Sequence, residues 1–271
     1  MGGGCGDMLD AMTLLNEQPA TAADLLPLAL TSYGHFTSMR ADADRRIRGL
    51  SLHLERLARD SETVFGTTVD PARVRRLVAT ALDGTPGPCV VRVTHYDPAV
   101  NLARPADATT PQLLVTARPA ADLPPPPLTA QTITYERDLP QVKHCGLFGA
   151  LHARRTAQLN GFDDALFTGT DGLVSEGGTW NIGFIDTDNT IVWPQAPVLP
   201  GVTMALLQEH TAHTVAPVTA EQARGMTAAF ATNTSIGVRA LAAIDDHPLD
   251  TAHPALTALR DTYLKIPGED L

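Results

Sequence analysis

At the centre of the chain stands Leu139-Pro140-Gln141-Val142-Lys143-His144-Cys145-Gly146, which contains one of only two lysines among 271 residues. The other, Lys265, lies in the charged C-terminal tail, and 18 arginines supply the remaining fixed cations. An arginine stays protonated and is a poor nucleophile, whereas a lysine amine can lose its proton and attack a carbonyl. Lys143 is therefore either a chance surface lysine or a nucleophile, and the segments around it decide between the two.

Composition and charge narrow the class of protein. With 44% hydrophobic residues, a chain of this length can bury a sizeable core and is expected to form two domains. We find neither a bilayer-spanning apolar stretch nor a signal peptide, and expect a cytoplasmic protein with no membrane partner. The net charge of −10 argues against a nucleic-acid partner. Three widely spaced cysteines, Cys5, Cys89 and Cys145, favour reduced thiols and predict no metal site.

The first 120 residues mix helix and strand signals, so we predict an α+β N-terminal domain over 1–120. Asp70-Pro71 is a capping residue followed by proline, which opens a helix. Pro27 is expected to end a short helix that Thr21 caps. The predicted helices span 21–26, 50–64 and 70–82, and the predicted strands span 33–40, 88–94 and 112–116.

Four consecutive prolines, 124–127, form a stiff segment that cannot continue a helix or a central strand. We therefore expect an interdomain connection over 121–129 and a second domain over 130–271. The predicted helices of this second domain span 143–160, 200–211, 219–225 and 254–265, and its predicted strands span 165–168, 173–175, 180–185, 190–193 and 228–232.

Four further segments accompany the lysine in a suggestive order. They are His53-Leu54-Glu55-Arg56-Leu57, Ser175-Glu176-Gly177-Gly178-Thr179-Trp180-Asn181-Ile182-Gly183-Phe184, Leu199-Pro200-Gly201-Val202-Thr203 and Phe230-Ala231-Thr232-Asn233-Thr234-Ser235. With the lysine segment, they resemble the class IV aminotransferase family, the fold-type IV pyridoxal phosphate enzymes. That family includes branched-chain aminotransferases, D-amino-acid aminotransferases and aminodeoxychorismate lyases, and the resemblance runs from about Tyr33 to about Arg239.

The resemblance implies a small N-terminal α/β domain, a larger C-terminal domain with a mixed sheet or barrel and helices, a site in the cleft between them, and a homodimer. It makes Lys143 the residue that binds the aldehyde of pyridoxal 5′-phosphate and moves the proton from the substrate α-carbon. It places Glu176 against the pyridine nitrogen, where a carboxylate keeps that nitrogen protonated. Taken alone, Glu176 also suits a turn beside two glycines.

The cofactor phosphate needs several donors and positive potential. A helix that opens at Pro200-Gly201 offers free backbone N–H groups and a favourable dipole. The resemblance assigns to the phosphate the backbone of Val202 and Thr203, the hydroxyl of Thr234, and Arg56 as the fixed cation. Without it, Arg56 would be an ordinary solvated helix arginine. The resemblance places Asn181 near the cofactor's phenolic oxygen or behind Glu176 as its support.

Two residues depart from the aminotransferase pattern. Many members carry a tyrosine five residues after the lysine, where this chain has Phe148, which removes one hydrogen-bond donor from the cofactor hydroxyl. In addition, Phe36-Thr37-Ser38-Met39-Arg40 resembles the Phe-Thr-Thr pattern of the lyases. A hydroxyl of Thr37 or Ser38 near the cofactor could relay a proton during elimination, so Thr37 is a candidate catalytic residue.

Substrate recognition is expected in the first domain, with Phe36, Ser38, Arg40 and Arg92 as candidates. Arg92 lies among valines on a predicted strand, where an arginine is costly without an anionic partner. That partner is either a substrate carboxylate or an acidic side chain of the protein. For Arg40 the structural salt bridge is the preferred interpretation.

Three functions remain open from the sequence. The first is a pyridoxal-phosphate-dependent aminotransferase that acts on a small amino acid or amine and a keto acceptor. The second is a β-eliminating lyase similar to aminodeoxychorismate lyase, which the Thr37-Ser38 pair supports. The third is a family member that binds a ligand without turnover, which the loss of the tyrosine at Phe148 supports.

Overall fold

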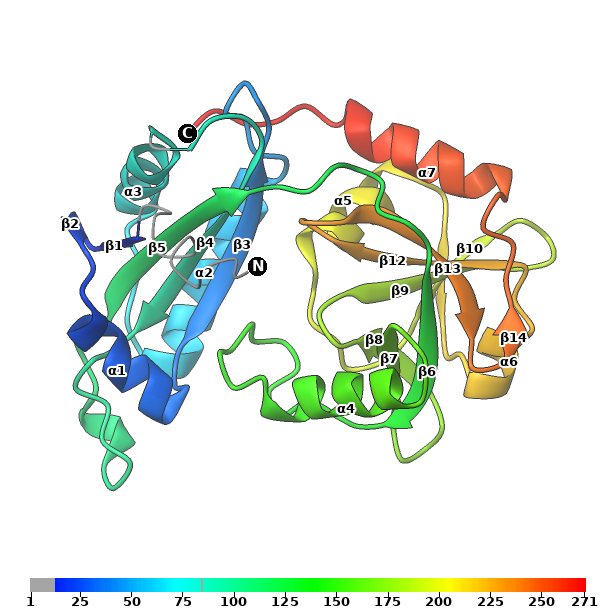
Figure 1. Ribbon diagram of the computed structural model, residues 1–271, viewed down its shortest axis with the longest axis horizontal. Coiled ribbons are helices and arrows are strands. Elements are labelled where there is room, and N and C mark those ends of the chain that lie inside the picture. Colours follow the sequence, from blue (N-terminus) through cyan, green and yellow to red (C-terminus); the bar gives the residue numbers. More distant parts are fainter. Residues whose placement is uncertain (1–12, 84) are drawn as a thin grey trace, which may run out of the picture. The chain divides into compact units, whose positions relative to one another are not determined.

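The protein is composed of two compact units (Figure 1). The computed structural model describes residues 13–83 and 85–271, so Cys5 lies outside the described residues. The N-terminal unit groups Met1–Ala120, Val142–Gly146 and Pro267–Leu271, and the C-terminal unit groups Ala121–Gln141 and Leu147–Ile266.

This grouping differs from the sequence boundaries, which placed all of 130–271 in one domain. The short segment around Lys143 belongs to the N-terminal unit because its backbone pairs there. The N–H of Phe36 donates to the carbonyl of Lys143 at 2.8 Å, and the N–H of Cys145 donates to the carbonyl of Gly34 at 2.8 Å. The same pairing keeps Lys143 out of a helix. The prediction of a helix from 143 onward was therefore wrong at its start, since α4 covers only Phe148–Leu159.

An antiparallel five-stranded sheet forms the framework of the N-terminal unit, in the order β2-β1-β5-β4-β3. The helices α2 and α3 pack on this sheet. The elements of the unit are β1 (Thr13–Leu15), β2 (Gln18–Pro19), α1 (Ala22–Thr31), β3 (His35–Ala41), α2 (Leu50–Phe65), α3 (Pro71–Asp83), β4 (Cys89–Tyr96), the short 3₁₀ helix η1 (Pro105–Asp107) and β5 (Gln112–Pro119). Contrary to the prediction, α1 continues through Pro27 to Thr31.

Strand alternation divides this sheet into two different faces. Met39, Val91 and Val115 are fully buried in the core that also contains leucines and valines of α2 and α3. The neighbours of these residues along each strand point to the other face. Ser38 lies opposite Arg92 there, in the register of β3 and β4. The helix-covered face is thus mainly apolar, apart from Thr37, which contacts His53 and Arg56 of α2, and the other face carries polar and cationic side chains.

The C-terminal unit contains a nine-stranded sheet, part of which closes on itself. Its path runs β11-β10-β9-β12-β13-β6-β7-β8, and an additional pairing of β8 with β9 joins β9, β12, β13, β6, β7 and β8 into a ring. Its strands are β6 (Leu128–Thr134), β7 (Asp164–Thr168), β8 (Val174–Gly177), β9 (Asn181–Ile185), β10 (Ile191–Pro194), β11 (Thr214–Ala216), β12 (Ala228–Asn233), β13 (Gly237–Ile244) and β14 (His247–Pro248). Parallel and antiparallel pairs both occur, which confirms the predicted mixed sheet.

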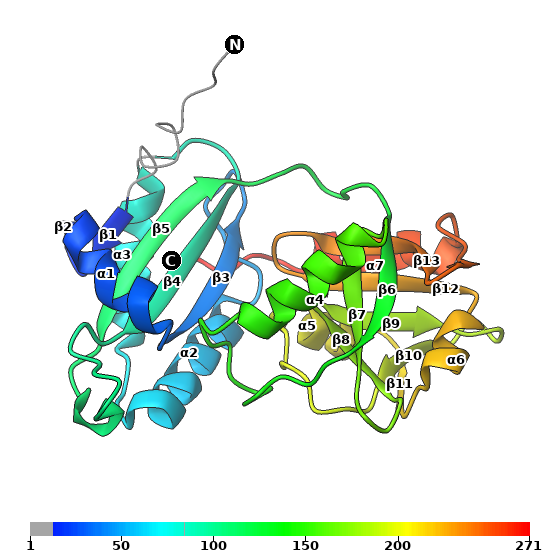
Figure 2. The same ribbon diagram turned by 60° about the horizontal axis from the view of Figure 1, so that its bottom comes forward.

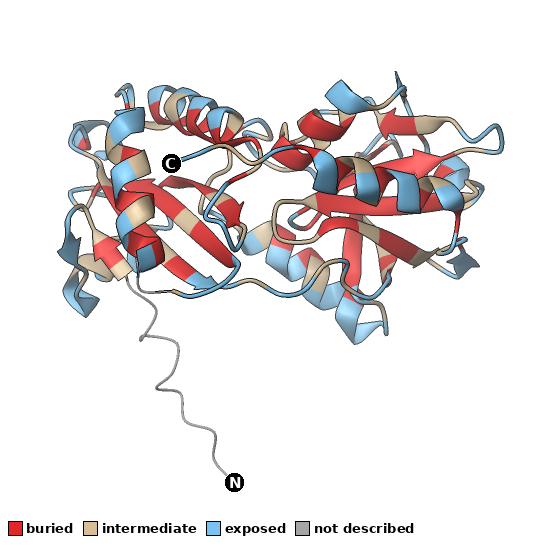
Figure 3. Ribbon diagram, turned by 90° about the horizontal axis from the view of Figure 1, so that it is seen from above, coloured by how far each residue is buried: buried red, intermediate tan, exposed pale blue. Residues whose placement is uncertain are grey.

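Helices surround this ring. They are α4, α5 (Val202–His210), α6 (Ala220–Arg224) and α7 (Pro254–Lys265). The helix α4 packs on β6 and β7 (Figure 2), and its buried residues are the alanines Ala150, Ala153 and Ala157. Small side chains let the helix approach the sheet closely. Buried residues follow the sheets and the helix faces turned toward them in both units (Figure 3).

Close packing inside the ring requires glycine at one position. A Cβ atom on Gly183 would lie 2.3 Å from the ring of Phe230 on the neighbouring strand β12. Phe230 in turn packs edge-on against Trp193, with ring centroids 5.2 Å apart. The Asn181–Ile185 strand is therefore fixed against β12, and this places the residues at its start.

Candidate functional site

Lys143 is held by its backbone on both sides. Its carbonyl accepts from Phe36 of β3, and its N–H donates to the Asp60 carboxylate of α2 at 2.9 Å. The backbone at Gly34 passes close to the backbone of His95. Glycine is needed there, because a Cβ on residue 34 would lie 2.8 Å from the carbonyl oxygen of His95. The lysine therefore occupies a fixed place in the N-terminal unit, although the sequence predicted it on a helix.

The Phe36 ring lies beside two cations. The Lys143 ammonium nitrogen is 4.9 Å from the ring centroid, and the Arg92 guanidinium carbon is 3.6 Å from it. Arg92 also donates to the Thr94 hydroxyl at 3.0 Å and to the Cys145 sulfur at 3.6 Å. Burial lowers the pKa of Arg92. Within residues 13–83 and 85–271 it has no carboxylate partner, so an anion is the group that its environment lacks.

Arg56 is buried rather than solvated. It lies on α2 with 6% of its surface exposed, and its Nη2 donates to the Thr37 hydroxyl at 2.7 Å. Burial lowers its pKa to about 10, and the nearby Asp60 charge partly offsets this. Its Nε has no hydrogen-bond partner within the described chain. A buried guanidinium with a free donor is suited to an anionic ligand.

The Thr37 hydroxyl contacts two buried side chains of α2. Besides accepting from Arg56, its Oγ1 lies 2.7 Å from Nδ1 of His53. Burial, followed by the charges of Arg56 and Lys143, lowers the pKa of His53 well below its usual value. The imidazole is therefore neutral, and which of the two groups donates depends on which ring nitrogen of His53 carries the proton. Thr37 accordingly orients Arg56, and its role in proton transfer stays a prediction.

The two other substrate candidates differ in their settings. Ser38 is half-buried and pairs with Arg92 across the strands. Arg40 is buried and lies 3.8 Å from Asp42, the structural ion pair that the sequence favoured. Ser38 thus lies beside Arg92 on the cationic face, while Arg40 has an acid near it.

Glu176 is buried at the end of β8 in the C-terminal unit, with 4% of its surface exposed. Arg137 approaches its Oε1 at 3.2 Å. The N–H of Leu199 lies 3.3 Å from Oε1 and 3.4 Å from Oε2. A buried carboxylate with a cation and a backbone donor is stabilised in one orientation. Glu176 is therefore not a solvated turn residue.

Asn181 supports the loop that leads into α5. Its amide nitrogen donates to the carbonyl of Leu199 at 2.9 Å, and the N–H of Leu199 faces Glu176. A Cβ on Gly201 would lie 2.1 Å from the Asn181 Oδ1. Asn181 thus supports Glu176 through Leu199 and fixes Gly201, the residue before α5.

The start of α5 has the properties of an anion-binding site. Gly201 caps this helix without a side chain, so the first N–H groups have no side-chain acceptor. The hydroxyls of Thr203 on α5 and Thr232 on β12 are buried without a hydrogen-bond partner in the described residues. The helix packs against β12, and Thr234 lies half-buried in the turn that follows β12. The unsatisfied hydroxyls of Thr203 and Thr232, with the N–H groups at the start of α5, are suited to a phosphate.

Phe148 is not a buried site residue within one chain. It is the first residue of α4 and is 83% exposed, with its ring stacked on His152 at a centroid distance of 6.0 Å. The hydroxyl that a tyrosine would supply is absent at this position. A different phenol lies against the same helix start, because a Cβ on Gly149 would lie 2.6 Å from the hydroxyl oxygen of Tyr135.

The sequence did not predict several residues that contact the candidate site residues and fix their positions. Asp60 holds Lys143, His53 holds Thr37, Arg137 holds Glu176, and Thr232 lies beside α5. The signal for Asp60 was present, because it lies four residues after Arg56 and so on the same helix face. The others depend on contacts between distant segments, which a single sequence does not reveal.

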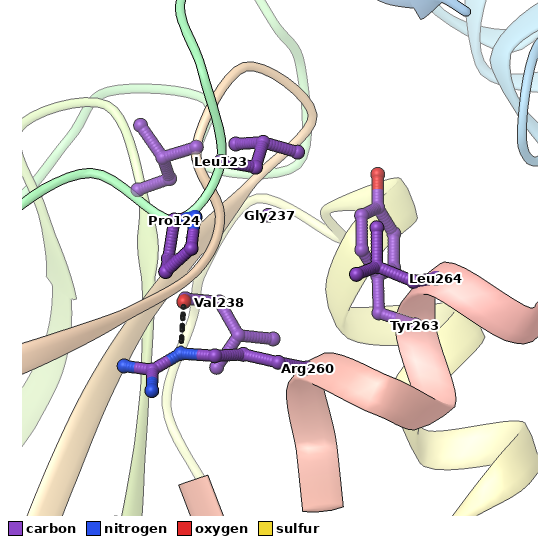
Figure 4. Close-up of a pocket in the computed structure, with 8 residues that line it drawn as sticks. Leu123, Pro124, Gly237, Val238, Arg260, Tyr263 and Leu264 are labelled. Carbon is purple, nitrogen blue, oxygen red and sulfur yellow. Dashed lines mark hydrogen bonds between the residues drawn. The ribbon is translucent and has the colours of Figure 1, made fainter. Parts of the chain in front are cut away.

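One apolar hollow in the C-terminal unit is formed by the connection, the β12–β13 turn and α7 (Figure 4). It is lined by Leu123, Pro124, Ile236, Gly237, Val238, Arg260, Tyr263 and Leu264. Arg260 donates to the carbonyl of Val238 at 3.2 Å (Figure 4). None of the candidate site residues lines this hollow, and it offers few polar groups for a cofactor.

Two classes of site are absent from the part of the chain that the structure describes. No group of three or more histidines, cysteines or acidic residues could hold a metal ion. Likewise, the described helices are all too short or too polar to cross a membrane.

Comparison with known proteins gives a consistent result. Residues 34–244 match the family model described as amino-transferase class IV. No curated protein matches the chain in sequence. Among solved structures, a branched-chain amino acid aminotransferase from T.th., complexed with N-(5′-phosphopyridoxyl)-L-glutamate, has a TM-score of 0.82 at 20% identity and covers 93% of this chain and 92% of its own.

Two further structures show the same fold. The branched-chain aminotransferase of the archaeon Thermoproteus uzoniensis, with norvaline, has a TM-score of 0.82 at 17% identity, covering 93% of each chain. A hypothetical aminotransferase from Mycobacterium tuberculosis in its PLP-bound form has a TM-score of 0.78 at 18% identity, covering 94% of this chain and 99% of that one. The predicted fold class is confirmed.

Proposed function

We propose that this chain, which belongs to the class IV aminotransferase family, is a pyridoxal-phosphate-dependent aminotransferase that transfers the amino group of a small amino acid or amine to a keto acid. The observation that carries the proposal is Lys143, whose peptide is fixed on both sides and whose ammonium lies over Phe36 beside Arg92.

The residues present fit pyridoxal phosphate. Arg56 has a buried donor without a partner in the described chain, and the start of α5 has free N–H groups with the unsatisfied hydroxyl of Thr203. These groups, with Thr234 and the backbone of Val202, are proposed to hold the phosphate. When bound, the cofactor supplies an aldehyde that combines with an amine and a ring that accepts the electron pair left on the α-carbon.

Lys143 and Glu176 are proposed to have separate chemical roles. Lys143 would hold the cofactor through its amine, and the same amine, once free, would take the proton from the substrate α-carbon. Glu176 would face the pyridine nitrogen and favour its protonated form, and Arg137, Leu199 and, through Leu199, Asn181 keep its carboxylate in place. Its negative charge stabilises the protonated ring nitrogen.

Arg92 is the proposed carboxylate-binding residue for the substrate. It has no acidic partner among the described residues, and it shares the Phe36 ring with Lys143. Phe36 and Ser38 are proposed to contact the substrate beside it. An amino acid would thus bind with its carboxylate at Arg92 and its amine toward Lys143.

Thr37 is the residue that distinguishes the aminotransferase hypothesis from the lyase hypothesis. The lyase hypothesis uses a threonine hydroxyl as a proton relay, but the Thr37 hydroxyl is fully buried and accepts from Arg56. This supports the aminotransferase as the proposed activity. No feature of the site similarly supports a protein that binds a ligand without turnover, since both Lys143 and Glu176 are present and fixed.

We propose a homodimer as the assembly and the cytoplasm as the location. Phe148, Leu151 and Leu159 are large, exposed and on one face of α4, which supports burial by a second copy. The free thiols of Cys89 and Cys145 support a reducing compartment. A chain that sediments as a monomer at micromolar concentration would contradict the dimer.

Single-turnover spectroscopy tests the proposed activity. The protein is loaded with pyridoxal phosphate and mixed with one amino donor at a time, without a keto acid. Transamination converts the bound cofactor to pyridoxamine phosphate and releases one equivalent of keto product. Release of product with the aldehyde form retained would indicate elimination, and no change with any donor would indicate a binder.

A further inference from the structure

We propose that Asp60 is a positioning residue for the reaction: its carboxylate anchors the peptide of Lys143 and so determines where the lysine amine lies. The inference rests on the proposed function, because it gives Lys143 a reaction to perform. Asp60 lies on α2 and is fully buried.

The two oxygens of Asp60 have different partners. Oδ2 accepts from the N–H of Lys143 at 2.9 Å. Oδ1 accepts from Nε and Nη2 of Arg59 at 3.1 and 2.7 Å. Burying a carboxylate is costly unless cations and donors surround it. Here Arg59 contributes the neutralising charge, while the other oxygen binds the lysine backbone.

Asp60 and Arg56, the residue proposed to bind the phosphate, lie on the same face of α2. Arg56 and Asp60 are four residues apart on α2, and the Asp60 charge acts on Arg56 by raising its pKa against the effect of burial. A rigid helix therefore links the group proposed to hold the phosphate to the group that holds the lysine.

The lysine peptide is thereby fixed from a strand and from a helix. Its carbonyl accepts from Phe36 on β3, and its N–H donates to Asp60 on α2. With both backbone groups fixed, only the side-chain torsions of Lys143 remain to move its amine. A displacement of about 1 Å in a reacting group can lower a rate about 100-fold, so the anchor has a direct effect on reactivity.

Labelling and hydrogen exchange test the inference on the full chain. Cofactor-free protein of the parent, Asp60→Ala, Asp60→Asn and Asp83→Ala is mixed with pyridoxal phosphate and reduced with borohydride at timed intervals. Peptide mass spectrometry then gives the rate of labelling at residue 143. Amide hydrogen exchange at Lys143 is measured in the same proteins without cofactor.

Asp60→Ala is expected to label about 10-fold more slowly or worse and to exchange the Lys143 amide faster. Asp60→Asn keeps an oxygen acceptor and is expected to remain within about threefold of the parent in both measurements. Asp83→Ala is the matched control, because Asp83 pairs with Arg45 at the surface, and it is expected to behave as the parent.

The outcomes separate this inference from the proposed function. A parent chain without label on residue 143 would overturn the proposed function. A labelled parent whose labelling rate and Lys143 exchange are unchanged in Asp60→Ala would overturn the role of Asp60 alone. If Asp60→Ala does not fold by circular dichroism, Asp60→Ser replaces it, because a serine hydroxyl is too short to span the same bond.

Discussion

Among single residues, Arg56 connects the sequence motif to the structure most directly. It is buried, its Nη2 is held by Thr37, and its Nε is unpartnered in the described chain. Replacement by alanine should weaken pyridoxal phosphate binding by about 1.5–3 kcal/mol, the usual worth of a charge-assisted hydrogen bond. Equilibrium dialysis of the cofactor measures this. Arg73→Ala, which removes a surface ion pair with Glu17, is the control, and equal affinity in the two variants would show that Arg56 does not hold the phosphate.

Thr37 supports Arg56, so its loss should affect binding rather than proton transfer. Thr37→Val removes the acceptor of the Arg56 bond at 2.7 Å and should weaken cofactor affinity by about 0.5–1.5 kcal/mol. With saturating cofactor, single-turnover rates should fall less than about 10-fold, below the range for a positioned proton donor. Thr37→Ser should restore both values. A collapse of turnover in Thr37→Val with cofactor still bound would instead support the lyase hypothesis.

At the scale of elements, local signals predicted the isolated helices well. The helix expected over 50–64 is α2, Leu50–Phe65, and the helix expected over 254–265 is α7 with the same bounds. Apolar periodicity and terminal proline or glycine are sufficient there, because each helix buries one face. The strand β13, Gly237–Ile244, was not predicted, although it forms a hairpin with the adjacent β12 as well as pairing with the distant β6.

The residues of the candidate site also divide into those that local sequence motifs predict and those that depend on long-range contacts. The sequence located Lys143, Glu176 and the α5 start through motifs that are contiguous. It did not locate Asp60, His53 or Arg137 as partners, since their contacts depend on how strands and helices meet. The segment around Lys143 was assigned to a helix for this reason, whereas Phe36 and Asp60 hold it in an extended crossing.

The start of α5 gives a prediction at this scale. Gly201→Ala would place a Cβ 2.1 Å from the Asn181 oxygen, so either the Asn181 side chain or the first turn of the helix must move. Overpacking of this kind costs about 1–3 kcal/mol, and we expect weaker cofactor binding, measured by fluorescence titration. Gly225→Ala is the control, because its Cβ would lie 3.5 Å from the carbonyl oxygen of Gln222, an ordinary contact. Unchanged cofactor affinity in Gly201→Ala would contradict the anion site at α5.

For the whole molecule, buried histidines predict a loss of stability in acid. Burial is the main cause that lowers the pKa of His35 to about 3 and of His95 to about 4, and it lowers that of His53 as well. Above the unfolded pKa of about 6.5 both states are neutral. Below it the unfolded chain binds protons that the folded chain does not. The free energy of unfolding should then fall by up to about 1.4 kcal/mol per pH unit for each histidine.

Urea unfolding at pH 7, 6 and 5 measures this dependence. His95→Asn should lower stability at pH 7 because it disturbs the contacts of His95 with His35 and Ser61. It should also reduce the slope between pH 6 and 5, because one fewer group takes up a proton on unfolding. An identical slope in the variant and the parent would show that His95 is not neutral in the folded protein.

The central claim is that Lys143 carries the cofactor, and borohydride reduction tests it most directly. The protein is incubated with pyridoxal phosphate, reduced and digested, and the labelled peptide is identified by mass spectrometry. Since Lys143 and Lys265 are the only lysines, the assignment has few alternatives. We predict one label per chain, on Lys143, and its loss in Lys143→Ala. Label on Lys265, or on neither lysine, would contradict the claim.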